Sequence, residues 1–369
     1  MANKAKQADS IRLASFLPKT KSGKNTASLF AVVCGVSFLR SGTRNFTNIM
    51  LDKIFKYTGL RLEFFDNMLM RASQKYALND PFELRPSHKK SNKAFADASY
   101  FDYAVVSLSE TNNNLLMWSH YADQHKGMVI EFDMTKPLFD SYKTYKATMP
   151  DPDDEYDCVD IIDEEETKKR EAIKSGQIQR VRYNSMRPSI YNFDNVLEHF
   201  LVKSEEWIYE KEHRVILPLI TADKIIVHEK YLPKIEFTLY DSNELNKVPL
   251  DNNMYLINLK EVTERDGNRF LSGWYSTTTS EEDLKYGFIE STYLEYLREI
   301  SEDPSTIFLY QVPPKAIKSI FLGCRVSSED RNAVMEKIRT SDSLEHIEIF
   351  QATPSNERFE LEFKKLTKA

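Results

Sequence analysis

"YAVVSLSETNNNLLMWSHYADQHKGMVIEFD", residues Tyr103–Asp133, is the stretch that decides the fold. Its first part, Tyr103–Ser109, is a short apolar run containing two valines, which predicts a β-strand. The asparagine-rich turn and the NNLLMWSHYADQH segment that follow have the spacing of a short helix ending near Gly127. Residues Gly127–Asp133 then alternate between apolar and polar side chains, which predicts a second strand.

The rest of the chain mixes helical and strand patterns in the same irregular way. Apolar residues at helical spacing predict a helix over Leu62–Ala77, and Tyr209–Leu217 is expected to be one strand. Near the C-terminus, three apolar runs predict strands, and a helix capped by Ser327 or Ser328 is expected between the last two. Helices and strands follow each other without a regular βαβ rhythm. This favours an α+β fold, with a mixed sheet and flanking helices in a single elaborated domain.

The domain boundaries follow from changes in composition along the chain. Residues 51–369 are expected to form one domain with an enlarged middle at 221–300. Residues 1–50 are expected to be an N-terminal extension, in which a basic segment precedes the apolar run Ser28–Leu39. That outline is shared by a secretory signal, by a buried extra element and by a chain whose true start is Met50. The buried extra element and the later start at Met50 are both favoured over the secretory signal.

Composition excludes several classes of protein. The net charge of −6 does not indicate nucleic-acid binding, and the three cysteines stand too far apart for a disulfide framework or a Cys-x-x-Cys metal site. No apolar run approaches the roughly 20 residues of a membrane span. The sequence also lacks the motifs of P-loop, Rossmann, nucleophile-elbow and zincin enzymes. We therefore expect a cytoplasmic protein with no membrane partner.

The WSHYADQH segment carries the first candidate cluster. Trp118, Tyr121 and His125 would share one broad face of a helix, with His120 beside them. Such side chains either pack in the core or form a stacking site for the planar ring of a ligand. The two histidines are five positions apart, which misses the spacing for two metal ligands on one helix, so no metal site is predicted.

Two further clusters carry carboxylates. On the expected strand Tyr209–Leu217, Glu210, Glu212 and Arg214 would project to one face. They form either a surface ladder of ion pairs or a carboxylate pair held at a cleft by an arginine. In the turn NDPFE, Asn79 and Asp80 either cap backbone groups or line a ligand site.

These motifs, in this order, resemble a bacterial domain-of-unknown-function family, number 2971. The resemblance is expected to span Leu51–Arg339 and rests above all on NDPFE, WSHYADQHKG and WIYEKEHR. It implies a cytoplasmic bacterial protein associated with accessory or defence-type genes, and it implies no substrate. Residues 1–50 lie outside it.

A more distant similarity concerns motif order. ADP-ribosyltransferases combine an early strand residue, a strand bearing Ser or Thr, and a late glutamate, often within Glu-x-Glu. Here Lys56 and Tyr57 come early, Ser107 and Ser109 follow, and the glutamates come last. The similarity implies that Glu212 would stabilise an oxocarbenium-like transition state, with Glu210 as its partner and Arg214 as positioner or phosphate clamp. The usual early Arg or His of that pattern is missing.

Two hypotheses about function follow. The first is an enzyme that cleaves NAD or transfers ADP-ribose, as an effector in a stress or anti-phage response. NAD is then the candidate cofactor. The second is a non-enzymatic module that senses a small ligand or a partner. Release of nicotinamide from NAD discriminates between them. Neither hypothesis identifies a protein partner. The residues expected to contact a ligand are Tyr57, Asn79, Asp80, Ser107, Ser109, Trp118, His120, Tyr121 and His125.

Overall fold

The computed structural model describes residues 53–85, 87, 103–139, 177–188, 199–238, 246–259 and 295–367. Several predictions concern segments outside these residues. They are the N-terminal extension with its apolar run Ser28–Leu39, and the part of the enlarged middle that lies between residues 260 and 294. The division of the chain into residues 1–50 and 51–369 therefore stays a prediction.

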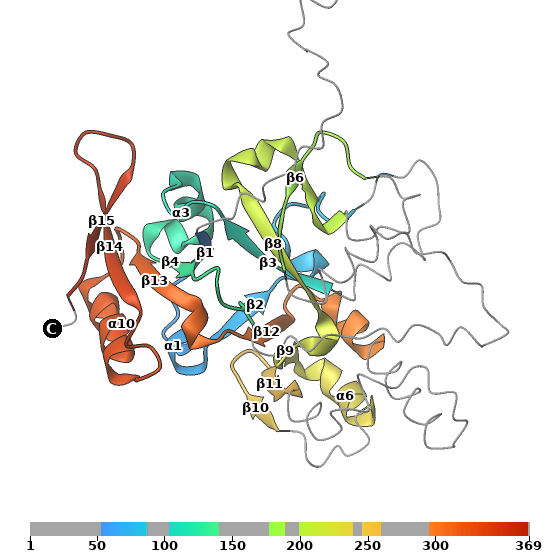
Figure 1. The fold of residues 1–369 in the computed structure, drawn as a ribbon. Coiled ribbons are helices and arrows are strands. Elements are labelled where there is room, and N and C mark those ends of the chain that lie inside the picture. Colours follow the sequence, from blue (N-terminus) through green and yellow to red (C-terminus); the bar gives the residue numbers. More distant parts are fainter. Residues whose placement is uncertain are drawn as a thin grey trace, which may run out of the picture. The chain divides into compact units, whose positions relative to one another are not determined.

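The described residues form more strand than helix (Figure 1). The strands are β1 (Ile54–Thr58), β2 (Leu69–Ala72), β3 (Tyr103–Ser109), β4 (Met128–Phe132), β5 (Ile178–Arg180), β6 (Arg182–Tyr183), β7 (Val202–Lys203), β8 (Glu212–Pro218), β9 (Lys224–His228), β10 (Lys247–Pro249), β11 (Met254–Asn258), β12 (Ile307–Gln311), β13 (Ile317–Leu322), β14 (Glu348–Pro354) and β15 (Leu361–Lys365).

The described helices are short, apart from the last one. The α-helices that lie wholly within the described residues are α1 (Glu63–Asn67), α3 (Leu115–Tyr121), α6 (Leu232–Thr238) and α10 (Ser328–Thr340). The 3-10 helices are η1 (Lys75–Ala77), η2 (Asp123–His125), η4 (Glu205–Glu210), η5 (Leu219–Thr221), η6 (Glu229–Tyr231) and η8 (Pro314–Ala316).

The strands form two large sheets and a two-stranded β6–β7 sheet. The first sheet has eight strands in the order β15-β14-β13-β4-β1-β3-β8-β5, and the second has five in the order β10-β11-β9-β12-β2. Neighbouring strands are antiparallel except for the parallel pairs β13–β14 and β6–β7. The α+β class with a mixed sheet is therefore confirmed.

The stretch Tyr103–Asp133 folds as its pattern predicts, except that the helix ends at Tyr121 instead of near Gly127 and does not include His125. β3 covers the predicted strand Tyr103–Ser109, and β4 lies within Gly127–Asp133. Between them, the Asn114 side chain accepts hydrogen bonds from the amides of Leu116 and Met117, which caps α3. The two strands do not pair with each other, because β1 inserts between them.

The predicted helix Leu62–Ala77 is wrong. The chain forms α1 over Glu63–Asn67, then adopts a left-handed conformation at Met68 with φ 53°, and continues as β2. The buried side chains of Met70 and Ala72 alternate with partly exposed ones, and pairing of β2 with β12 satisfies its backbone. Tertiary pairing thus overrides a local helical pattern.

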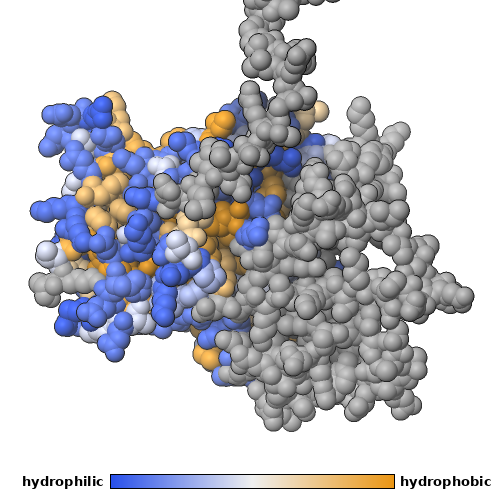
Figure 2. Space-filling view, in the orientation of Figure 1, coloured by the Kyte–Doolittle hydropathy of each residue, from blue (hydrophilic) through white to orange (hydrophobic). Residues whose placement is uncertain are grey.

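The C-terminal helix confirms its prediction. Ser327 caps α10 by accepting a hydrogen bond from the amide of Asp330. Val334 and Ile338, one turn apart, are buried in the main core, while most of the other face is exposed. Figure 2 shows hydrophilic side chains gathered over the part of the molecule that carries α10 and the β14–β15 ribbon.

The two large sheets separate along one of the two edges of β3. One edge pairs with β8 along its whole length. On the other edge, Ser109 pairs with Phe55 of β1, whereas Val105 exchanges two backbone hydrogen bonds with Ser73, which follows β2. Ser107 lies between these two contacts. Because backbone groups alternate along a strand, those of Ser107 point to the same side as those of Val105, into the gap.

Candidate functional site

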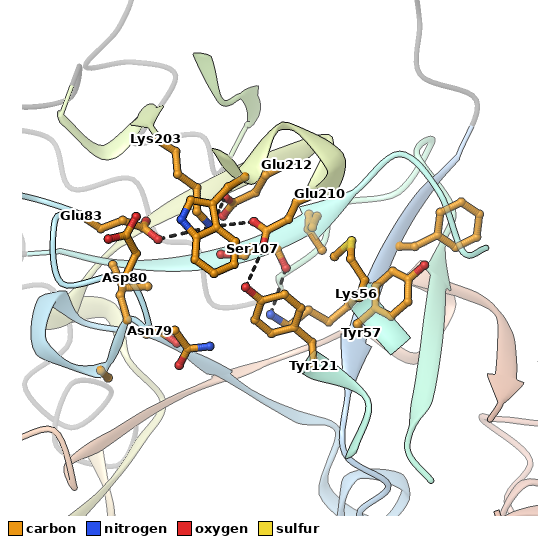
Figure 3. A pocket seen from close by; sticks show the side chains of 17 residues that line it. Lys56, Tyr57, Asn79, Asp80, Glu83, Ser107, Tyr121, Lys203, Glu210 and Glu212 are labelled. Atoms are coloured by element: carbon orange, nitrogen blue, oxygen red, sulfur yellow. Dashed lines mark hydrogen bonds and ion pairs between the residues drawn. The ribbon is translucent and has the colours of Figure 1, made fainter. Parts of the chain in front are cut away.

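A polar pocket of about 140 Å³ opens at this gap (Figure 3). Its wall combines charged, hydroxyl and aromatic side chains from β1, β3, α3, β7, η4 and β8, and from the turn that follows β2. The lining residues are Phe55, Lys56, Tyr57, Ser73, Ala77, Leu78, Asn79, Asp80, Glu83, Ser107, Leu108, Met117, Tyr121, Lys203, Trp207, Glu210 and Glu212.

Lys203 connects three carboxylates of the pocket. Its Nζ lies 2.6 Å from Glu210 Oε2, 3.1 Å from Glu212 Oε2 and 3.3 Å from Glu83 Oε1. All four side chains are almost fully buried. A buried ammonium with three carboxylate partners holds segments far apart in the sequence together, because separating any one of them would leave a buried charge unpaired.

Arg214 supports the cluster from behind. Its Nε donates to Glu212 Oε1 at 2.7 Å, its NH1 group donates to the Phe200 carbonyl at 2.8 Å, and its NH2 group donates to Glu83. The side chain is fully buried and does not line the pocket. Arg214 thus positions the carboxylates. Its guanidinium is fully engaged inside the protein, which corrects the expectation of a phosphate clamp.

The two neighbouring glutamates have opposite pKa shifts. Burial alone would raise the pKa of Glu212, but Arg214 and Lys203 outweigh it and lower that pKa to about 2. Burial raises the pKa of Glu210, against the opposing effects of Lys203 and Tyr121. Tyr121 donates its hydroxyl hydrogen to Glu210 Oε1 at 2.5 Å. Glu212 is therefore a fixed anion, whereas Glu210 is the carboxyl closer to exchanging a proton.

Seven of the expected site residues do line this pocket. They come from four separate parts of the sequence, and Figure 3 shows their side chains around one opening. Asp80 also stabilises its own turn, since its carboxylate accepts a hydrogen bond from the Phe82 amide. The seven are Tyr57, Asn79, Asp80, Ser107, Tyr121, Glu210 and Glu212.

Four other expected ligand residues lie elsewhere. Trp118 is fully buried, its indole nitrogen donates to the Asn112 carbonyl, and the His125 ring stacks on it. His120 is exposed, and neither histidine lines the pocket. Ser109 is buried and donates to the Glu210 carbonyl at 2.7 Å. The core interpretation holds for Trp118, because a seven-residue helix has one buried face and the tryptophan occupies it.

The prediction of one strand over Tyr209–Leu217 is wrong at its start. Tyr209 and Glu210 belong to η4, and Lys211 has a left-handed conformation with φ 46° before β8 begins at Glu212. Ser204 caps η4 through its hydroxyl, which starts the turn that a strand pattern does not include. Glu210 and Glu212 still line one pocket, although they lie on either side of a turn at Lys211 and not on one strand.

Sequence reasoning missed Lys203 and Glu83. Glu83 ends the motif NDPFE and Lys203 lies four residues before the motif WIYEKEHR, but their residue types are common on surfaces. The available signal was an excess of acids near Arg214, which calls for a second buried cation. Trp207 was also missed. Its ring lies 4.9 Å from Lys203 Nζ and forms part of the wall.

A second hollow of about 280 Å³ shares the wall formed by Asp80, Glu83 and Lys203. It is also lined by Arg85 and Arg187, which are exposed. The first hollow therefore has an excess of carboxylates, and the second has two additional guanidinium groups.

The described part of the chain shows neither a metal cluster nor a membrane helix. There, no three His, Cys, Asp or Glu side chains are grouped so that they could hold a metal ion. None of the helices in these segments is long and apolar enough to cross a membrane.

Comparison with known proteins gives one match. Residues 117–215 match the profile of the family described as "Protein of unknown function (DUF2971)". This segment is shorter than the expected span and contains most of α3, β4, the two glutamates and Arg214. No curated protein and no solved structure matches the chain. The match confirms that the chain resembles the DUF2971 family, as its motifs indicated.

Proposed function

We propose that the pocket is the active site of an enzyme that cleaves the N-glycosidic bond between nicotinamide and ribose in NAD. The ADP-ribosyl group would pass to water or to an acceptor. The observation that carries this proposal is the pair Glu210 and Glu212, two carboxylates in one pocket whose pKa values are shifted in opposite directions. Such pairs divide the roles of proton exchange and charge stabilisation.

The two carboxylates would act on one reacting carbon. As the bond from the ribose C1 to the ring nitrogen breaks, its electron pair goes to the nicotinamide ring and neutralises it. Positive charge then develops at C1, and the fixed anion of Glu212 stabilises it. Glu210 accepts the proton of the attacking hydroxyl or water as the new C1–oxygen bond forms.

The adjoining hollows also suit the two ends of this substrate. The first has more carboxylates than cations and is lined by the aromatic rings of Tyr121 and Trp207, which favours a cationic planar ring. The second contains Arg85 and Arg187, whose guanidinium groups are suited to phosphate oxygens. We therefore expect nicotinamide in the first hollow and the pyrophosphate toward the second.

The test is nicotinamide release from NAD by the full chain and by three variants. Glu210→Gln and Glu212→Gln should each lower the rate at least 100-fold, which corresponds to about 3 kcal/mol of transition-state stabilisation. The matched control is Glu110→Gln, because Glu110 pairs with Arg180 outside the pocket. Folding of each variant is checked by its unfolding midpoint. No release from the folded full chain would contradict the proposal.

A second candidate function is a non-enzymatic module that senses a small ligand. The observation that favours it is the engagement of the Glu212 carboxylate by both Arg214 and Lys203, which neutralises much of its charge. Under this alternative, ADP-ribose or nicotinamide would raise the unfolding midpoint, NAD would stay intact, and Glu210→Gln would weaken the effect.

The proposal also concerns the setting of the protein. We propose a bacterial cytoplasmic effector in a stress or anti-phage response, because NAD is intracellular and the resemblance implies defence-type genes. The three distant cysteines agree with a reducing compartment. Toxicity of the intact chain on expression, absent with Glu210→Gln, would support this setting.

A further inference from the structure

Lys56 is a pocket amine that the ion cluster does not use. It extends from β1, lines the first hollow and is partly exposed. Its Nζ donates to the Ser107 carbonyl at 2.9 Å. Among the residues that the structure describes, no carboxylate lies within ion-pair distance of this Nζ, whereas Lys203 has three such partners.

The position of Lys56 follows from the gap between the sheets. The register Phe55↔Ser109 and the bridge Ser73↔Val105 leave the Ser107 carbonyl facing an opening instead of a strand. Lys56 lies on the face of β1 opposite Phe55 and Tyr57, and its long side chain reaches back into that opening. A single neutral acceptor thus holds the amine at the pocket wall.

We propose that Lys56 is a covalent binding residue for a carbonyl compound, an aldehyde or ketone that enters the first hollow and forms an imine with Nζ. The amine lone pair adds to the carbonyl carbon and gives a carbinolamine. Loss of water then forms the C=N bond, with the leaving oxygen taking a proton from a neighbouring acid. Glu210, in the same wall, is suited to accept a proton from the nitrogen and to pass it to the leaving oxygen.

Electrostatics support this chemistry. Burial lowers the pKa of Lys56 to about 8; Arg71 and Arg214 lower it further, while Glu212 and Glu210 oppose the shift. At pH 7 roughly 10% of the amine is then unprotonated, against less than 0.1% for a lysine with an ordinary pKa. Only the unprotonated amine attacks a carbonyl, which is how enzymes activate lysines for imine formation.

The inference is independent of NAD cleavage, because it requires only the amine, the pocket and a carbonyl ligand. The test uses butyraldehyde with sodium cyanoborohydride at pH 7, which reduces an imine to a stable secondary amine. Adducts are mapped by mass spectrometry of peptides after short reaction times. Lys53, exposed just before β1, serves as the internal reference.

Lys56 should be labelled on the order of tenfold or more faster than Lys53, with a rate that saturates as the aldehyde concentration rises. Its pH profile should level off above about pH 8 while that of Lys53 continues to rise. Lys56→Arg and Lys56→Met should remove this adduct and leave the labelling of other lysines unchanged, with folding checked by the unfolding midpoint.

Two outcomes would overturn the inference. Labelling of Lys56 no faster than Lys53 would show that its hydrogen bond to Ser107 is a purely structural contact. A fast rate that stays linear in aldehyde concentration would show a reactive amine without a binding site. Both measurements are made on the full chain, so they can be interpreted even if a variant fails to fold.

Discussion

At the scale of single residues, the pocket is governed by how buried charges are shared. Glu83, Glu210 and Glu212 have only Lys203 and Arg214 as ion-pair partners in the described structure. A buried ion pair adds little net stability compared with apolar packing, but removal of one partner is costly because the other charge stays behind. Stability and the proposed chemistry therefore depend on the same side chains.

Glu212→Gln should lower the free energy of unfolding at pH 7 by about 3–5 kcal/mol, because Arg214 and Lys203 each lose one of their buried carboxylate partners. The low pKa of Glu212 makes the effect depend on pH. A carboxyl whose pKa falls from 4.5 in the unfolded chain to about 2 in the folded protein stabilises the fold above pH 4.5. That contribution disappears as the pH falls from 4.5 to 2.

Urea unfolding at pH 7 and pH 3 measures this difference. The gap between the full chain and Glu212→Gln should shrink at pH 3, whereas Glu110→Gln should behave like the full chain at both values. An unchanged unfolding free energy at pH 7 would mean that the Arg214 guanidinium finds another partner.

Lys203→Met should destabilise the protein at pH 7 by roughly 3–5 kcal/mol, since it leaves Glu83, Glu210 and Glu212 with Arg214 alone. Lys230→Met is the matched control. Lys230 pairs with Asp303 on the surface, where water screens the charges, so its removal should change stability little. Thermal unfolding of both variants compares them, and equal midpoints would contradict the role assigned to Lys203.

At the scale of elements, close backbone approaches fix the loop between α3 and β4. Asp123, Gln124 and His125 have positive φ angles, and Gly127 follows. A Cβ atom at Gly127 would lie 2.3 Å from the Thr58 carbonyl oxygen, closer than any contact allows. This glycine therefore lets the loop lie against the end of β1, next to the strand residues that line the pocket.

Gly127→Ala should destabilise the protein by more than about 2 kcal/mol, because backbone atoms on both sides must move. Gly59→Ala is the matched control, since nothing lies within 4 Å of a Cβ at that position. It should be neutral, or stabilising by up to about 1 kcal/mol through reduced entropy of the unfolded chain. Chemical unfolding of the two variants decides, and a well-tolerated Gly127→Ala would show that the loop can move away.

At the scale of the whole molecule, residues 1–50 are predicted to be dispensable. They precede the recognised motifs, and Met50 offers a second start. A chain that begins at Met50 should fold with an unchanged thermal midpoint. At this size a loss of about 1 kcal/mol lowers the midpoint by only a few degrees. A drop of several degrees would therefore show that Ser28–Leu39 contributes to the core.

The sequence by itself determined the elements whose local pattern and tertiary setting agree. β3, β4 and α10 were predicted correctly, because side-chain periodicity reports which face of an element is buried and capping residues report where it begins. It also indicated the α+β class and the family resemblance. The prediction of a helix over Leu62–Ala77 was wrong because β2 pairs with β12, a strand distant in the sequence, and the local pattern of residues does not indicate that pairing.

Only the tertiary structure decided which polar side chains meet. Glu83, in the turn that follows β2, and Lys203, at the end of β7, join Glu212 of β8 because all three elements border one pocket. Trp118, in contrast, is buried because it lies on the one face of α3 that packs against the core. Periodicity encodes burial within an element, whereas a charge cluster depends on the pairing of distant strands, which no local pattern specifies.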